Sequence, residues 1–271
     1  MADDVVLDEL RDGIATLTLN RPERRNAWTI AMHKRYWGLL ERCDQDPEVR
    51  VVVVTGSGTT FCPGADTESL QGYTASGELD PLAATITQPD WYPMTVRKPV
   101  IAAINGACAG FGLAVAMMCD VRIAAAGAKM TTAFARRGLP GLHGVAWLLP
   151  RLVGASRAAE LMLSGRTFTT EEAAAIGLVH QLVLPDQVLP TAHAYAADLV
   201  ANCSPESWMH MKHQLLLAGQ QTFPEAVEDA SGREVAALST RDFHEGVFSF
   251  VERRPPSFAP LGEGGKPAGD V

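Results

Sequence analysis

The order of apolar and polar residues predicts strands that alternate with helices. Residues 13–20 (GIATLTLN) alternate apolar and polar side chains, which is the period of a strand with one buried face. The segments 50–56 (RVVVVTG) and 99–106 (PVIAAING) contain continuous apolar runs and end near glycine, as in strands buried on both faces. Apolar residues recur at roughly helical spacing within residues 27–46. Strands separated by a helix predict an α/β core.

The second half of the chain has the pattern of helices. Residues 156–165 and 169–177 have helical composition, and each ends at a glycine, a common helix terminator. Ser204 is a typical N-cap, and Pro205 suits the first helical position. The last residues, 261–271, are rich in proline and glycine, so we expect a flexible tail there.

Composition and charge exclude several kinds of partner. The 271 residues are 47% hydrophobic and 20% charged, which is enough for a sizeable buried core. A net charge of -8 without a dense basic tract argues against nucleic acid. The apolar stretch 99–128 is interrupted by Asn105 and Asp120, so it predicts a buried strand, turn and helix, and no membrane span. The acidic N-terminus lacks a secretory-signal pattern, and we expect a cytoplasmic protein.

The cysteines and histidines have no metal-site spacing. Five cysteines without a CxxC pair argue against a disulfide framework and against a thiolate zinc site. The seven histidines include no HExxH motif, so we expect no metal. The cysteines, at positions 43, 62, 108, 119 and 203, are expected to be buried free thiols.

Two junctions run from a buried strand through small residues into a probable helix, at 51–70 and at 100–120. The first N–H groups of a helix have no intrahelical acceptor and carry the positive end of the helix dipole, so they can receive a developing anion. Neither junction fits a dinucleotide-binding fingerprint, because Phe61 and Val115 stand where its third glycine belongs. No GxSxG nucleophile motif is present. The small residues that would let a ligand approach the backbone are Gly64, Ala65, Gly110 and Gly112.

A series of motifs adds a family resemblance. Between about residue 13 and residue 258 the chain contains, in this order, NRPERRNAWT, FCPGAD, KPVIAAINGACAGFGLAVAMMCDVRIAA, LPRLVG, SGRTFTTEEAAAIGLVHQLV and EGVFSFVERRPPSF. Together these motifs resemble the enoyl-CoA hydratase/isomerase (crotonase) superfamily. The resemblance implies an α/β spiral of repeated ββα units over 1–200 and a C-terminal helical region for trimerisation over 201–260. It also implies a homotrimer or a dimer of trimers.

The same resemblance implies an acyl-CoA thioester as substrate and no separate cofactor, because coenzyme A is part of that substrate. In this family, the residues at the positions of Ala65 and Phe111 donate backbone N–H groups to the thioester carbonyl and stabilise the enolate oxygen. Phe111 departs from the usual glycine, so its side chain must turn away from the acyl group.

The resemblance does not imply the usual two-glutamate hydration mechanism of the family. Hydratases of this family use two glutamates, and Ala114 and Phe134 occupy those positions here. Neither side chain can move a proton. The remaining candidates for an acid or base are Asp66 and His143. A carboxylate near a helix start is more often a cap, and an unperturbed imidazole can exchange protons near neutral pH.

Residues near the first junction are candidates for binding coenzyme A. Arg24 and Arg25 match a segment that commonly meets the nucleotide and pyrophosphate in the family, and guanidinium groups suit phosphate oxygens. The stretch from Ala65 through Asp66 and Thr67 to Glu68 would face the pantetheine arm. Trp91 and Tyr92 are candidates either for lining the acyl chamber or for core packing.

We therefore expect an enzyme that binds an acyl-CoA or enoyl-CoA, classed with enoyl-CoA hydratases or isomerases of fatty-acid or related acyl-CoA metabolism. A different reaction of the superfamily is an alternative: double-bond isomerisation, thioester hydrolysis or decarboxylation. Isomerisation needs only one shuttling base, which His143 or Asp66 could supply. A second alternative is a catalytically silent acyl-CoA binder.

Overall fold

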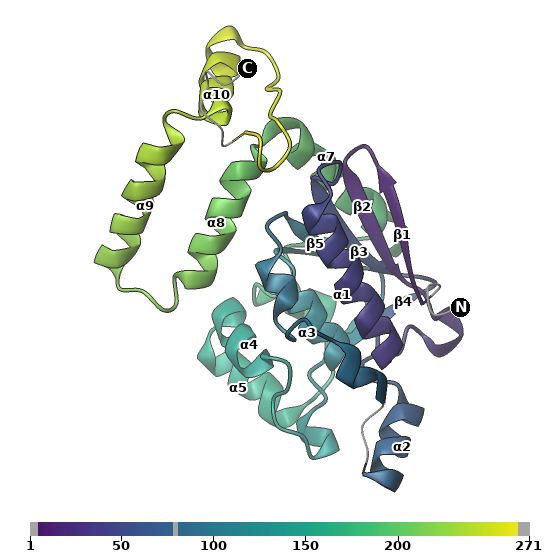
Figure 1. Cartoon of the computed structure of the whole chain (residues 1–271). Helices are drawn as coiled ribbons and strands as arrows, with labels where there is room; N and C mark the ends of the chain where they lie inside the picture. Colours follow the sequence, from purple (N-terminus) through teal and green to yellow (C-terminus); the bar gives the residue numbers. More distant parts are fainter. Residues whose placement is uncertain (1–4, 78–80, 265–271) are drawn as a thin grey trace.

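The computed structural model describes residues 5–77 and 81–264 and contains two β-sheets (Figure 1). In the larger sheet β1 is antiparallel to β2, and the other neighbouring strands are parallel. Its strands in spatial order are β1 (Val6–Arg11), β2 (Ile14–Leu19), β3 (Val51–Gly56), β5 (Val100–Ile104), β7 (Val121–Ala125) and β10 (Gln181–Val183).

The smaller sheet interleaves with the larger one along the chain. Each of β3, β5 and β7 is followed by a short strand of the smaller sheet and then by a helix, so the ββα unit repeats. This arrangement confirms the predicted α/β fold of repeated ββα units. The smaller sheet consists of β4 (Thr60–Cys62), β6 (Ala107–Ala109), β8 (Lys129–Thr131) and β9 (Phe168–Thr169).

Helices cover both faces of the larger sheet. Alternate residues of β3 point to opposite faces: Val52 and Val54 join a core with α1 and α3, whereas Val51 and Val53 pack with α7. The helices of this part are α1 (Ile30–Gln45), α2 (Thr67–Ser76), α3 (Phe111–Met118), α4 (Val145–Val153), α5 (Ala155–Ser164), α6 (Thr170–Ala175) and α7 (Val188–Asn202).

The strand predicted to have one exposed face is buried almost throughout, so that prediction was wrong. β2 lies between β1 and β3, and its more polar face is covered by α7. There the hydroxyl of Thr16 is 3.0 Å from Nε2 of His193. Thr16, which looks solvent-facing in the sequence, thus finds a hydrogen-bond partner on a helix far along the chain.

Three C-terminal helices, α8 (Pro205–Leu217), α9 (Phe223–Ala237) and α10 (Arg241–Glu252), extend away from the sheets (Figure 1). Ser204 caps α8 as predicted, accepting a hydrogen bond from the Ser207 N–H at 3.1 Å. These helices expose large apolar side chains, among them Leu215, Phe223, Val235, Phe248, Phe250 and Val251. The predicted flexible tail, 261–271, lies mostly outside the described residues. In the described part of the chain, no helix has the length and apolar character needed to cross a bilayer.

The turn between β5 and β6 leaves no room for a side chain at Gly106. A Cβ atom there would lie 2.0 Å from the Thr59 carbonyl oxygen, a backbone atom of the loop before β4. We expect Gly106→Ala to lower the free energy of unfolding by about 2 kcal/mol or more, because two backbones must separate. Gly38→Ala is the control, since space is open around this exposed helical glycine. It should stabilise the protein by about 0.5–1 kcal/mol. Urea unfolding measures both changes, and equal effects would contradict this packing.

Candidate active site

The two glycine-containing junctions of the sequence meet in space. β4 and β6 are parallel neighbours, with Thr60 beside Ala107 and Cys62 beside Cys108. Their carboxyl ends therefore leave the sheet at the same edge. Gly64, with φ +103°, fits so closely that a Cβ atom on it would lie 3.1 Å from the Ala109 carbonyl oxygen.

The Ala65 N–H is held in a defined direction. Trp28 forms a parallel bridge with Ala65: its N–H donates to the Gly64 carbonyl at 2.8 Å, and its carbonyl accepts from the Asp66 N–H at 2.8 Å. Because successive backbone groups of a strand point to opposite sides, the Ala65 N–H faces away from Trp28. No described residue accepts a hydrogen bond from it. Ala65 is exposed, so a ligand can reach this N–H.

Phe111 supplies a second free N–H at the adjoining junction. It is the first residue of α3, and the N-cap Gly110 has φ +51° and no capping side chain. The Phe111 N–H therefore lacks an intrahelical acceptor, and no other described residue accepts from it. Gly112, one residue further, brings α3 against β4: a Cβ atom there would lie 2.4 Å from the Cys62 carbonyl oxygen.

The Phe111 side chain turns into an aromatic cluster, where it is only 6% exposed. Its ring centroid lies 4.7 Å from that of Trp28 and 5.7 Å from that of His33. On another side it meets the His143 ring edge-on at 4.3 Å. The cluster thus anchors the first residue of α3 and with it the direction of the Phe111 N–H.

His143 forms a pair with Asp90. Its Nδ1 lies 3.0 Å from Oδ2 of Asp90, and the hydrogen bond from His143 lowers the pKa of Asp90 below its ordinary value. An ionised carboxylate can only accept, so Nδ1 carries the proton and Nε2 keeps its lone pair in the neutral imidazole. No described residue bonds to that Nε2. The Nε2 lone pair is therefore available to a ligand in the cavity beside it.

His143 lies in a loop, and its own backbone has φ +54°. Asp90 comes from a different loop, and the sequence analysis did not find it. Nothing local in QPDWYPM distinguishes this carboxylate, and 53 residues separate it from His143. Only the fold brings the two side chains together.

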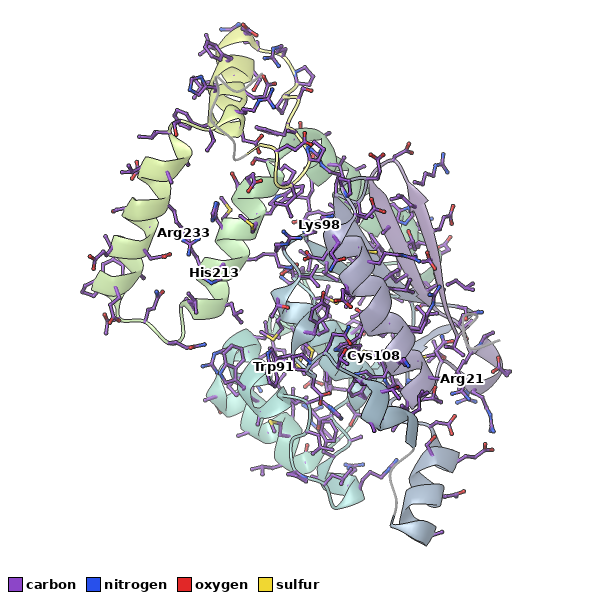
Figure 2. All side chains as sticks on the ribbon, viewed as in Figure 1. Arg21, Trp91, Lys98, Cys108, His213 and Arg233 are labelled. Atoms are coloured by element: carbon purple, nitrogen blue, oxygen red, sulfur yellow. The ribbon has the colours of Figure 1, made fainter. Side chains whose placement is uncertain are left out.

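A cavity of about 530 Å³ opens beside this pair. His143 and Asp90 line one side of it, and Trp91 lies next to α4, as Figure 2 shows. Tyr92 instead packs against the main core. The remaining lining residues are Met94, Met118, Gly144, Trp147, Leu148 and Leu216.

Asp66 is engaged in holding the first junction. Its Oδ2 accepts from Nη1 of Arg21 at 2.9 Å, and its Oδ1 accepts from the Glu68 N–H at 3.0 Å. Burial opposes ionisation, but the hydrogen bonds from Arg21 and Glu68 outweigh it and hold the pKa of Asp66 below its usual value. The carboxylate caps α2 and has both oxygens occupied, so its geometry suits positioning better than proton transfer.

The residues predicted to bind coenzyme A belong to the segment before α1 and to the first junction. Arg24 forms an exposed ion pair with Glu68, which connects the loop before α1 to α2. Arg25 adopts φ +54° immediately before the buried Asn26. Thr67 is the first residue of α2 and is exposed. The ion pair with Glu68 thus places Arg24 near the segment that follows Ala65, whereas Arg25 is exposed and forms no ion pair with the described residues of that segment.

Burial shifts the pKa values of other ionisable groups near the junctions away from neutrality. All five cysteines are free thiols, and burial raises the pKa of Cys62 to about 12. Burial lowers the pKa of His33 to about 4, so this imidazole is neutral at physiological pH. Ala114 is buried in α3, and Phe134 is buried at the start of the helical turn Ala135–Arg137.

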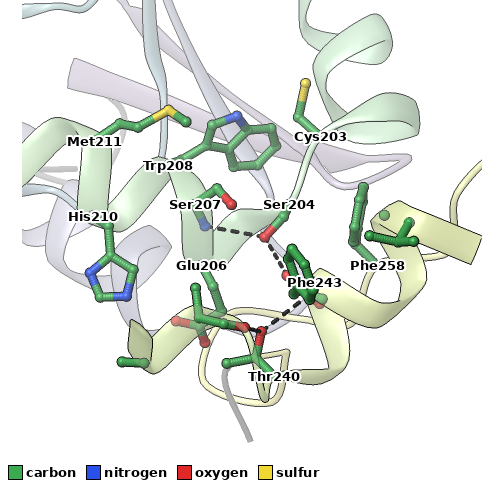
Figure 3. Close-up of a pocket in the computed structure, with 15 residues that line it drawn as sticks. Cys203, Ser204, Glu206, Ser207, Trp208, His210, Met211, Thr240, Phe243 and Phe258 are labelled. Atoms are coloured by element: carbon green, nitrogen blue, oxygen red, sulfur yellow. Dashed lines mark hydrogen bonds between the residues drawn. The ribbon is translucent and has the colours of Figure 1, made fainter. Parts of the chain in front are cut away.

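A second cavity of about 580 Å³ lies among the C-terminal helices (Figure 3). Ser204 donates a hydrogen bond to Asp242 in its wall, and Trp208, Phe243 and Phe258 make much of it apolar. Ala65 and Phe111 line neither cavity, but only the cavity beside His143 contains the His143–Asp90 pair, whose imidazole touches the Phe111 ring. The cavity beside His143 is therefore the candidate active site.

Comparisons with known proteins agree with this architecture. Residues 9–260 match the family model described as enoyl-CoA hydratase/isomerase. The chain belongs to the enoyl-CoA hydratase/isomerase family. A Mycobacterium leprae protein named probable enoyl-CoA hydratase echA12 is 37% identical over 94% of this chain and 90% of its own length.

Other members of the family differ in the reaction they are named for. The 1,2-epoxyphenylacetyl-CoA isomerase of Escherichia coli is 32% identical over 94% of this chain and 98% of its own length. A crystal structure of a probable enoyl-CoA hydratase/isomerase from Mycobacterium abscessus superimposes with a TM-score of 0.85. It is 32% identical and covers 94% of this chain and 99% of that one. Membership in the family thus fixes the fold and the chemical class but not the reaction.

The Arg21–Asp66 pair should stabilise the protein in a pH-dependent way. We expect Asp66→Asn to lower the free energy of unfolding at pH 7 by about 2 kcal/mol, because it removes one charge of a largely buried pair. The folded-state pKa lies below the ordinary value of 3.8, so the contribution is present above that value and is lost as the pH falls through the folded pKa.

Urea unfolding from pH 7 to pH 3 measures this effect, and the difference between the two proteins should shrink below about pH 4. Asp12→Asn is the control, since the Asp12 side chain is 85% exposed and its loss should change little. A difference that stays constant down to pH 3 would contradict the assignment.

Proposed function

We propose that the protein binds an acyl-CoA thioester, stabilises its enolate with the N–H groups of Ala65 and Phe111, and isomerises a double bond with His143 as the single base. The observation that carries this proposal is the His143–Asp90 pair, which lies against the Phe111 ring and beside a cavity. Two free N–H groups from neighbouring loops suit a thioester oxygen on which charge develops.

The chemistry needs one group that both takes and returns a proton. Nε2 of His143 removes a proton from the carbon between the thioester and the double bond of a 3-enoyl-CoA. The electrons of that C–H bond form the enolate, whose oxygen accepts from Ala65 and Phe111. The protonated Nε2 then delivers the proton to the far carbon of the former double bond, which gives the 2-enoyl-CoA. The Asp90 carboxylate stabilises the imidazolium between the two steps.

Hydration is less well supported by the same residues. Adding water requires one group to activate the water and another to protonate the α carbon. Ala114 and Phe134 occupy the positions of the family's two glutamates, and Asp66 is held by Arg21. A single imidazole matches a shuttle of one proton, and names of both isomerases and hydratases among the relatives are compatible with this choice.

The remaining parts of the chain have supporting roles in this proposal. Arg24 and Arg25 bind phosphates of coenzyme A, and the stretch from Ala65 to Glu68 borders the pantetheine arm. The apolar side chains that α8, α9 and α10 expose serve assembly into trimers, which matches a C-terminal helical region over 201–260.

The base is tested by His143→Asn, a residue type that tolerates the positive φ at this position. We expect kcat for converting a 3-enoyl-CoA into the conjugated 2-enoyl-CoA to fall about 100- to 10,000-fold, because the proton shuttle is removed. Absorbance of the conjugated thioester measures turnover, and calorimetry should find substrate affinity nearly unchanged. His244→Asn, at an exposed histidine of α10, is the control and should retain full activity.

Three results would contradict the proposal. Unchanged turnover in His143→Asn would exclude it as the base. Wild-type protein that binds short, medium and branched enoyl-CoAs but converts none of them would be a silent binder. Hydration of 2-enoyl-CoAs that proceeds faster than isomerisation would also contradict the single-base mechanism.

Asp90→Asn tests the orientation of the imidazole. The amide can donate to Nδ1 and so favours the tautomer that carries its proton on Nε2, where no lone pair then faces the substrate. We expect kcat to fall at least about tenfold, with substrate affinity and thermal stability unchanged. Asp186→Asn, at an exposed carboxylate, is the control. Parallel losses of activity and stability would instead indicate a purely structural role.

A further inference from the structure

We infer that the cavity beside His143 receives the acyl group and selects bulky apolar acyl groups over short or charged ones. This inference deepens the proposed function and rests on it. The cavity measures about 530 Å³, a size typical of sites that enclose a whole small molecule. A four-carbon acyl group would leave much of it empty.

The position of the cavity fits the path of an acyl chain. The thioester oxygen is held at the start of α3 by the Phe111 N–H, and Met118 at the other end of α3 lines the cavity. These two residues are separated by about 10 Å at the rise of an α-helix. His143 touches the Phe111 ring and also lines the cavity, so it stands between the two places. A chain leaving the thioester therefore passes Nε2 before it enters the apolar space.

The walls specify the chemistry of the group that fits. The lining is apolar apart from Asp90 and His143, which bond to each other through Oδ2 and Nδ1. Apolar groups gain from leaving water here, whereas a carboxylate on the acyl group would lose its hydration and meet the charge of Asp90. Methionine side chains adapt to irregular shapes, and tryptophans offer flat surfaces. The apolar walls are Trp91, Met94, Met118, Trp147, Leu148 and Leu216.

Two of these walls come from outside the ββα core. Trp91 is 62% exposed although it is large and apolar, so its indole presents an uncovered apolar surface to a group in the cavity. Leu216 comes from α8, so the C-terminal helical region helps to enclose the acyl group. The size selection is therefore set by residues that can be changed without touching the free N–H groups.

Calorimetry with saturated thioesters, which cannot be isomerised, tests the inference directly. We expect affinity to rise about fourfold for each methylene that enters the cavity, so octanoyl-CoA should bind on the order of 100-fold more tightly than butyryl-CoA. Phenylacetyl-CoA should also exceed butyryl-CoA, and comparing it with octanoyl-CoA tells an aryl preference from a linear one. Succinyl-CoA should bind more weakly than butyryl-CoA.

The results distinguish a failure of the proposed function from a failure of the selection for bulky acyl groups. If neither coenzyme A nor any thioester binds, the proposed function fails. If butyryl-CoA, octanoyl-CoA and phenylacetyl-CoA bind equally well, the proposed function stands and the selection for bulky groups is overturned.

Two variants test whether the preference for octanoyl-CoA arises in the cavity. Trp91→Ala and Leu216→Gln should each lower octanoyl-CoA affinity about tenfold while leaving butyryl-CoA affinity unchanged. Leu184→Ala, at a leucine that is 66% exposed and does not line the cavity, is the matched control. If both cavity variants keep the wild-type preference for octanoyl-CoA, the acyl group lies elsewhere and the inference is overturned.

Discussion

The close pairing of β4 with β6 is the constraint on which the site depends. These short parallel strands bring two strand-to-helix junctions to one edge, and the approach is tight enough that Gly64 and Gly112 have no space for an ordinary side chain. Larger residues would push α3 away from β4 and separate the Ala65 N–H from the Phe111 N–H. The glycines therefore serve the geometry of two backbone donors, and the donors need no particular side chain at either position.

A phenylalanine fits at position 111 because its side chain can turn away from the junction. The Phe111 ring turns into the cluster with Trp28 and His33, and Trp28 also fixes the Ala65 loop through two backbone hydrogen bonds. One aromatic residue thus touches both junctions. A bulky residue at this position stiffens the start of α3 and places the His143 ring against it, which a glycine would not do.

The fold and the two strand-to-helix junctions were predictable from the sequence, whereas the surroundings of His143 were predictable only in part. Continuous apolar runs marked β3 and β5, and small residues after two strands marked the junctions, because both signals are local. His143 was a candidate, but its partner Asp90 depends on two loops meeting, which no local pattern encodes. The misjudged face of β2 has the same origin, since α7 arrives from far along the chain to cover Thr16. Asp66 stood out through its position, yet its ion pair with Arg21 became visible only in three dimensions.

The proposed use of one imidazole in place of two glutamates has a physical consequence for the surroundings. A glutamate pair needs water and room for it near the reacting carbons, whereas a shuttle between two carbons works best where water is excluded. The neutral His33, the Phe111 ring and the apolar walls around His143 all reduce the local polarity. The His143–Asp90 pair is itself partly exposed, with 27% of the His143 side chain and 52% of the Asp90 side chain accessible, so a bound acyl group must cover the pair before the site is dry. If His143 is the single base that we propose, the missing carboxylates and the apolar walls of the cavity serve the same end, because the substrate itself then excludes water while one proton moves between carbons.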